Sequence, residues 1–219
     1  MSPSSRQHSL QTRMGTSPIP TMLFARLSDV EVCAGVRQDR RQRKSPRLPR
    51  YDYAWPGAYF VTICVADRMP RFGEVVEQRA CLNGAGEMID RHWRSIPERF
   101  PQVSLDAYVL MPNHLHGILL INTTDKAGAD SLSAILGAFK SLTTREYSDG
   151  VRRGLWPRYE RRLWQASFYD HVIRNERDLQ RVCDYIAANP ARWHEDREYR
   201  AWQQALLRQT TLAQDDNPA

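Results

Sequence analysis

Hydrophobic residues beyond position 51 recur with two periods, one typical of strands and one typical of helices. The run AYFVTICVA (58–66) is rich in aromatic and β-branched residues and predicts a buried strand. Residues 86–100 then carry apolar side chains at helical spacing, and Pro97 is expected to end this helix early. The apolar positions of this helix are Ile89, Trp93, Ile96 and Phe100.

A hairpin is predicted after this helix. The segments DAYVLM (106–111) and HLHGILLI (114–121) both have the composition of strands, and only Pro112 and Asn113 separate them. Because the connection is so short, the two strands are expected to pair in antiparallel fashion.

The remainder of the chain predicts a helix, a loop, a strand and a final helix. A helical stripe begins near Ser131, residues 148–163 predict a loop rich in Gly, Arg and Trp, and SFYDHVI (167–173) predicts a fourth strand. Asn175 can cap a last helix that ends before Pro190. The stripe after Ser131 consists of Leu132, Ile135, Leu136, Phe139 and Leu142, and that of the last helix of Leu179, Val182, Cys183 and Ile186.

The order β-α-β-β-α-β-α places the chain in the α+β class. It predicts a ferredoxin-like, or RRM-like, split βαβ fold with an antiparallel sheet, helices on one face and one added helix. We expect a single domain over residues 44–195, preceded by a basic, flexible arm (1–43) and followed by a polar tail (196–219) that is frayed from about residue 203.

Two histidines in the second hairpin strand are candidates for metal ligands. Residues two apart on a strand share a face, so His114 and His116 can aim at one point while Leu115 faces the other way. Neutral imidazole is a common ligand of divalent metals. The alternative is that both side chains are merely hydrogen-bonded surface or core groups.

The last predicted helix carries a second candidate pair. Tyr185 lies beside the apolar stripe, and Asn189 falls one turn later on the same face. An activated tyrosine can attack a phosphodiester, and an amide oxygen can complete a metal site. The alternative is a tyrosine that packs at the edge of the stripe with its hydroxyl in water.

Basic residues are concentrated in the N-terminal arm. The net charge is +6, and ten of the 31 Lys and Arg residues lie within the first 50 positions, against three acids. The stretch RQDRRQRKSPRLPR (37–50) suits contact with phosphates, although a solvated leader would have the same composition. The candidate DNA-binding residues in it are Arg43, Lys44, Arg47 and Arg50.

A second basic group belongs to the predicted loop before the fourth strand. Arginines there alternate with Trp156, Tyr159 and Trp164, a composition that suits a folded single strand of nucleic acid, with a solvated loop as the alternative. The candidate DNA-binding residues are Arg152, Arg153, Arg158, Arg161 and Arg162 of this loop, together with Lys140 beside the apolar stripe of the preceding predicted helix. His171 either hydrogen-bonds to one of the metal ligands or forms a hydrogen bond that is purely structural.

Cysteine usage and hydropathy favour a cytoplasmic protein. The four cysteines form no CxxC pair, which argues against a zinc knuckle or a disulfide framework. No apolar run approaches the roughly 18 residues of a membrane span.

Six ordered blocks of the sequence resemble the single-tyrosine HUH transposases, and within them the REP-associated tyrosine transposases. The most specific are Met-Pro-Asn followed by His-Leu-His (111–116) and DYIAANP (184–190). The others are RLPRYDYAWPGAYFVTICVADR (47–68), RFGEV (71–75), Phe-Lys-Ser (139–141) and WQASFYDHVIRNERDL (164–179). The resemblance covers about residues 44–195.

The resemblance implies an HUH endonuclease architecture and a role for each matching residue. His114 and His116 match the metal-binding pair, Tyr185 the nucleophile and Asn189 the third ligand of Mg or Mn. The implied activity is cleavage of single-stranded DNA at palindromic hairpins through a 5′-phosphotyrosine. The REP branch implies a monomer, and the insertion-sequence branch, whose dimers share active sites, leaves a dimer as the alternative.

Two other classes of function compete with a transposase. A ferredoxin-like sheet can bind single strands without any chemistry, so the chain could be a noncatalytic nucleic-acid-binding module. It could also be a metal-dependent hydrolase in which the histidines activate water and no covalent intermediate forms.

Overall fold

A four-stranded antiparallel sheet forms the centre of the protein. The computed structural model describes residues 56–122 and 130–215. The strands are β1 (Gly57–Cys64), β4 (Val103–Met111), β5 (His114–Ile121) and β6 (Tyr169–Ile173), in the spatial order β4-β5-β1-β6. The first and third strands along the chain therefore occupy the middle of the sheet, so the predicted ferredoxin-like α+β fold is confirmed.

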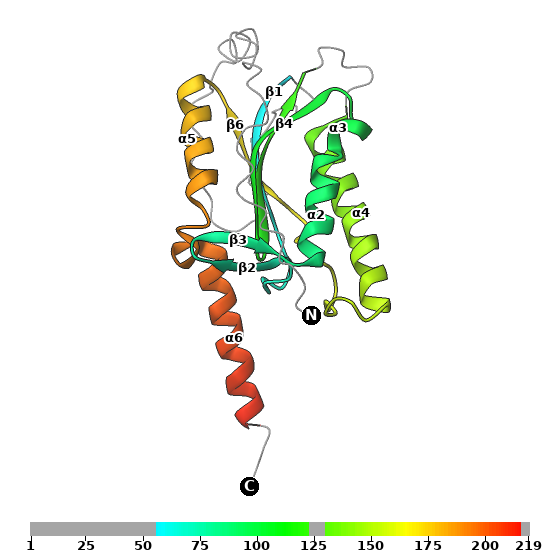
Figure 1. Ribbon diagram of the computed structural model, residues 1–219, viewed down its shortest axis with the longest axis vertical. Coiled ribbons are helices and arrows are strands. Elements are labelled where there is room, and N and C mark those ends of the chain that lie inside the picture. The colour runs from blue at the N-terminus through cyan, green and yellow to red at the C-terminus, as the bar shows by residue number, and fades with distance from the viewer. Residues whose placement is uncertain (1–55, 123–129, 216–219) are drawn as a thin grey trace, which may run out of the picture.

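Two crossover helices cover one face of this sheet (Figure 1). They are α2 (Gly84–Arg94), followed by the short α3 (Ile96–Arg99), and α4 (Leu132–Arg152). The break between α2 and α3 falls just before Pro97, which lies in the first turn of α3, where a proline is tolerated. Between helix and sheet, fully buried Trp93 packs onto Gly117 of β5, where a Cβ atom would lie 2.3 Å from its Cζ2.

The last core helix, α5 (Glu176–Ala188), covers the opposite face (Figure 1). The expectation that the helices share one face fits α2 and α4, and it is wrong for α5. The physical reason is that β1 and β5 present apolar side chains on both faces, so a second layer is needed. This layer consists of Leu179, Val182 and Ile186 of α5 packed on Ala58, Phe60, Ile118 and Ile173.

Three further elements differ from the sequence prediction. A separate hairpin forms from β2 (Gly73–Val76) and β3 (Arg79–Leu82), which the sequence did not reveal. The helix α4 continues to Arg152, although a loop was predicted from residue 148. After η1 (Trp193–Glu195), the predicted polar tail forms the helix α6 (Arg197–Asp215).

The basic arm (1–43) and the basic residues that follow it, Lys44, Arg47 and Arg50, lie outside the described residues, as does Arg43 within the arm. In the part of the chain that the structure describes, every helix is too short or too polar to cross a lipid bilayer.

Candidate functional site

The two histidines lie on the face of the sheet that α5 covers. Strand alternation turns Leu115 and Gly117 into the core beneath α2 and α4, and it turns His114 and His116 the other way. Both imidazoles are buried, and their ring centroids are 4.5 Å apart. The structure therefore brings the predicted pair together at one point.

Asn113, in the turn before β5, fixes the protonation of His114. The fully buried Asn113 amide donates from Nδ2 to the carbonyl oxygens of Arg68 (2.7 Å) and Glu198 (3.3 Å). Its Oδ1 therefore faces His114 Nδ1 at 2.9 Å, and only a protonated Nδ1 can donate to it. In the neutral ring, Nε2 then carries the lone pair that a metal ion needs.

The second imidazole is oriented from the neighbouring strand. Thr62 Oγ1 lies 2.8 Å from His116 Nδ1, and Thr62 is the register partner of His116 in β1. Burial lowers the pKa of His114 to about 4, against the charge of Asp196, which raises it. Burial and the neighbouring His114 hold the pKa of His116 well below its usual value. Both rings are therefore neutral at physiological pH, as ligation requires.

The tyrosine reaches the histidines from α5. Asn175 caps this helix by accepting from the backbone N–H of Asp178 (2.9 Å), and the apolar stripe lies against the sheet. Tyr185, 44% exposed, stands at the edge of that stripe with its hydroxyl 3.3 Å from His116 Nε2. Partial burial and the charge of Asp196 raise the pKa of Tyr185.

His171 has a structural place beside this helix. Its Nε2 lies 2.8 Å from the Asp178 carboxylate in the first turn of α5, so it joins β6 to the tyrosine helix. Its register partner is Phe60 of β1, whereas that of His116 is Thr62. We find His171 bonded to the helix rather than to either candidate ligand.

Asn189 closes α5 next to the histidines. It is 5% exposed and lies close enough to act on the pKa of both His114 and Tyr185. Its buried Oδ1 nevertheless has no hydrogen-bond partner, and the same is true of His114 Nε2. Pro190 follows at once, which holds the end of the helix, and hence this amide, at the site.

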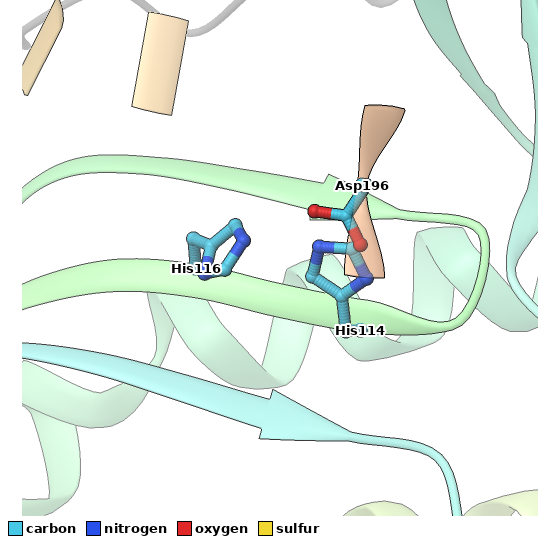
Figure 2. A group of neighbouring side chains, drawn as sticks. All are labelled: His114, His116 and Asp196. Atoms are coloured by element: carbon cyan, nitrogen blue, oxygen red, sulfur yellow. The ribbon is translucent and has the colours of Figure 1, made fainter. Parts of the chain in front are cut away.

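Asp196, between η1 and α6, is a member of the site that the sequence did not predict. One ligand atom each from His114, His116 and Asp196 lies within 4.8 Å of the others (Figure 2). Its segment looked like part of a charged tail, because WHEDREYR (193–200) carries five charged residues besides its histidine. The available signal was the position of an aspartate just before a helix, where its carboxylate accepts from the backbone N–H of Glu198 (2.6 Å).

These residues fit a divalent metal ion. Two neutral imidazoles, an amide oxygen and a carboxylate are ligands that Mg²⁺ or Mn²⁺ accepts. His114 Nε2 and Asn189 Oδ1 are buried without partners, a costly state for polar atoms unless something else binds them. His114, His116, Asn189 and Asp196 could therefore hold an ion that is not part of the structure.

The predicted DNA-binding residues of the second half divide into two groups. Lys140 donates from Nζ to the carbonyl oxygens of Gln165 and Ser167, both at 2.9 Å, and Arg152 pairs with Asp149. The remaining four, Arg153, Arg158, Arg161 and Arg162, have exposed side chains.

The aromatic residues of this loop are used for packing. Trp156 and Tyr159 lie against Tyr147 of α4 with ring centroids 5.2 and 5.9 Å apart, and Trp164 is buried. The arginines therefore lie beside rings that are largely occupied by the core, rather than beside free stacking platforms.

Comparisons with known proteins agree with the motifs. An uncharacterised protein of Haemophilus influenzae is 32% identical over 177 residues, which cover 72% of this chain and 93% of that protein. A second protein of that organism, provisionally named a REP-associated tyrosine transposase, is 26% identical over 65% of this chain and 75% of its own length. The Escherichia coli REP-associated tyrosine transposase is 28% identical over 40% of this chain and 44% of its length.

Other comparisons add little beyond these relatives. No family model matches the chain. Among solved structures, a REP-associated tyrosine transposase bound to a REP hairpin superposes with a TM-score of 0.47 and 22% identity, over 67% of this chain and 73% of that one.

The fold and the two named relatives together support a role in the transposase class. Within that class, the chain is similar to the REP-associated tyrosine transposases.

Proposed function

We propose that this protein is a metal-dependent single-stranded DNA endonuclease and strand transferase that uses Tyr185 as its nucleophile. The observation that carries the proposal is the distance of 3.3 Å between the Tyr185 hydroxyl and His116 Nε2, at a site with unpartnered buried acceptors. A phenol beside a candidate metal site is placed to attack a phosphate bound there. Neither a binding module nor a water-activating hydrolase needs a tyrosine at this point.

The proposed cleavage exchanges one phosphodiester for another. The Tyr185 oxygen forms a bond to phosphorus, the bond from phosphorus to the 3′ oxygen breaks, and the freed strand ends in a 3′-hydroxyl. The phenolic proton leaves to solvent, which half-exposed Tyr185 contacts, and the departing oxygen takes up a proton. An Mg or Mn ion held by His114, His116 and Asn189 would supply charge neutralisation and orientation of the phosphate.

The covalent link explains strand transfer without an energy source. The tyrosine phosphodiester retains the bond energy of the broken link, so a second 3′-hydroxyl can attack it and release the tyrosine. The raised pKa of Tyr185 in the metal-free protein means that the phenol stays protonated until a positive charge is nearby.

We propose that the DNA partner approaches the end of the sheet where His114 lies. The basic loop passes this end: Gln165 N donates to Cys64 O (2.9 Å), and Cys64 is the register partner of His114. Exposed Arg153, Arg158, Arg161 and Arg162 precede this contact and suit the phosphates of a folded single strand. A palindromic hairpin is the proposed substrate, as the resemblance to the REP-associated tyrosine transposases implies.

We also propose that one chain is a complete enzyme. Tyr185 and both histidines meet within the same chain, so the site needs no helix from a second copy. A monomer is therefore the simplest active form.

The test is incubation of the protein with single-stranded hairpin DNA, labelled at either end, and Mg²⁺ or Mn²⁺. Denaturing gels should show a protein-linked adduct on the 3′ fragment and a free 3′-hydroxyl on the other. Tyr185→Phe should abolish the adduct, and Tyr169→Phe, which alters a tyrosine of β6 that is 53% exposed, should not.

Other outcomes would favour the rival functions. Cleavage without a linked strand, unaffected by Tyr185→Phe, would indicate a metal-dependent hydrolase. Equal binding of DNA by both variants, with no cleavage by the unaltered protein, would indicate a noncatalytic binding module.

A further inference from the structure

The carboxylate of Asp196 is held against the two imidazoles by the segment that follows α5. Figure 2 shows Asp196 reaching the pair of histidines from outside the sheet, with both histidines on β5. The ligand atoms of His114, His116 and Asp196 lie within 4.8 Å of one another, which a single ion can span.

Two sets of interactions fix the position of Asp196. One carboxylate oxygen accepts from the backbone N–H of Glu198 (2.6 Å) and so caps α6. Glu198 in turn pairs with Arg68 at 2.9 Å, and its carbonyl oxygen accepts from the buried Asn113 amide. The first turn of α6 is thereby attached to the segment after β1 and to the turn between β4 and β5, directly before His114.

The charge of Asp196 has no cationic partner among the described side chains. The salt bridges of that part of the chain do not include it, although Arg68 and Arg192 lie in neighbouring turns and pair with glutamates. His114 directs its Nδ1 proton to Asn113 Oδ1, so its Nε2 presents a lone pair and no proton to the site. A partly buried carboxylate beside neutral rings and two unpartnered buried acceptors forms a site short of positive charge.

We infer that Asp196 is a fourth protein ligand of the divalent ion, and that it sets the affinity of the site. The inference rests on the proposed function, because it concerns the same ion. Two imidazoles and one amide bring no charge, so the carboxylate alone would reduce the charge of a bound ion from +2 to +1. A hard oxygen ligand of this kind suits Mg²⁺ and Mn²⁺.

The alternative role of Asp196 is that of a helix cap alone. An asparagine caps a helix about as well as an aspartate and has the same size. Asp196→Asn therefore removes the charge and keeps the cap, which separates the two roles. Glu195→Gln is the matched control, since it removes a carboxylate one residue away that is 61% exposed.

The experiment is a titration of the full-length protein with Mn²⁺ in the absence of DNA. Free Mn²⁺ is measured by electron paramagnetic resonance, and the fluorescence of Trp193, whose ring lies 5.9 Å from that of His114, reports on binding at the site. Thermal unfolding without metal checks that each variant remains folded.

We expect Asp196→Asn to weaken Mn²⁺ binding by at least about tenfold. Loss of a residue that only hydrogen-bonds to a metal ligand already lowers metal affinity by about 10- to 100-fold. Glu195→Gln should leave the affinity unchanged, and His114→Ala should abolish binding. If Asp196→Asn binds Mn²⁺ like the unaltered protein while His114→Ala does not, the inference is overturned and the proposed metal site stands. If His114→Ala also binds normally, the proposed site itself is wrong.

Discussion

Asn113 offers a sharp test of how the site is held together, because its amide joins three separate segments. It donates to the carbonyl oxygens of Arg68 and Glu198 and accepts from His114 Nδ1, with no exposure to solvent. Asn113→Leu keeps the volume of the side chain and removes all three hydrogen bonds. We expect the change to destabilise the protein and to weaken the metal site together.

The two magnitudes follow from the contacts. Each hydrogen bond contributes about 1 kcal/mol net, so the free energy of unfolding should fall by roughly 3 kcal/mol. His114 loses the acceptor that selects its tautomer and orientation, and loss of such a partner costs about 10- to 100-fold in metal affinity. Urea unfolding measures the first quantity, and Mn²⁺ titration of the folded protein measures the second.

The matched control lies on the other face of the sheet. Thr143→Val removes the buried acceptor of the Trp164 indole N–H (2.9 Å), which belongs to the core on the face opposite the histidines, and should destabilise the protein without altering metal binding. If both variants lose the same affinity for Mn²⁺, or if neither does, Asn113 does not govern His114 and the reasoning is refuted.

Three further predictions concern the sheet, the tyrosine helix and the DNA surface. Gly117→Ala should cost about 1 to 3 kcal/mol in urea unfolding, because its Cβ would lie 2.3 Å from buried Trp93; an unchanged midpoint would show that the ring moves freely. Although burial opposes the shift, hydrogen bonds hold the pKa of Asp178 below its usual value, so this carboxylate stabilises the fold above about pH 4 and ceases to do so as pH falls through its folded pKa. Asp178→Asn should therefore reduce stability at pH 7 and flatten the acid limb of a stability profile, and a parallel profile would contradict this. Lys140→Gln should lower the melting temperature and leave the salt dependence of DNA binding intact, whereas Arg162→Gln should reduce that salt slope; the reverse pattern would make Lys140 a phosphate contact.

The elements that the sequence predicts well are those whose signals are local. The helix α4 begins after Ser131 as expected, and Asn175 caps α5 as expected; each side chain accepts from the backbone N–H three residues later. The short Pro112-Asn113 connection does form an antiparallel hairpin, with Met111 opposite His114. Period and cap chemistry decide these features, and both are visible within a few residues.

The features that were missed depend on contacts distant in sequence or on uncommon turn chemistry. The β2-β3 hairpin turns through Glu77 and Gln78 with positive φ angles of 47° and 62°, where an Asn-Gly pair would have been the usual signal. Gly150 looked like part of a loop, yet it lies in α4. The helix has a glycine at this position and the Trp156 ring packs where a side chain would be. Nothing local indicates that a glycine makes room for a ring.

The site was predictable as far as its residues share an element. His114 and His116 share a strand face, and Tyr185 and Asn189 share a helix face, so each pair follows from spacing alone. That the two pairs meet depends on which face of the sheet α5 covers, and periodicity says nothing about that choice. Asp196 is further removed, because it comes from a segment whose only local role is to begin a helix.

The arrangement separates the part of the sheet that must be rigid from the part that carries the chemistry. Along β5, Leu115 and Gly117 pack into the core beneath α2 and α4. The alternate residues, His114 and His116, are oriented by Asn113 and Thr62 from adjacent segments. The tyrosine arrives instead on a helix attached by a smaller apolar layer and by the contact of its first turn with β6. Alternation on a single strand therefore fixes the imidazoles on one side without disturbing the core on the other, and the proposed nucleophile comes from a separate helix.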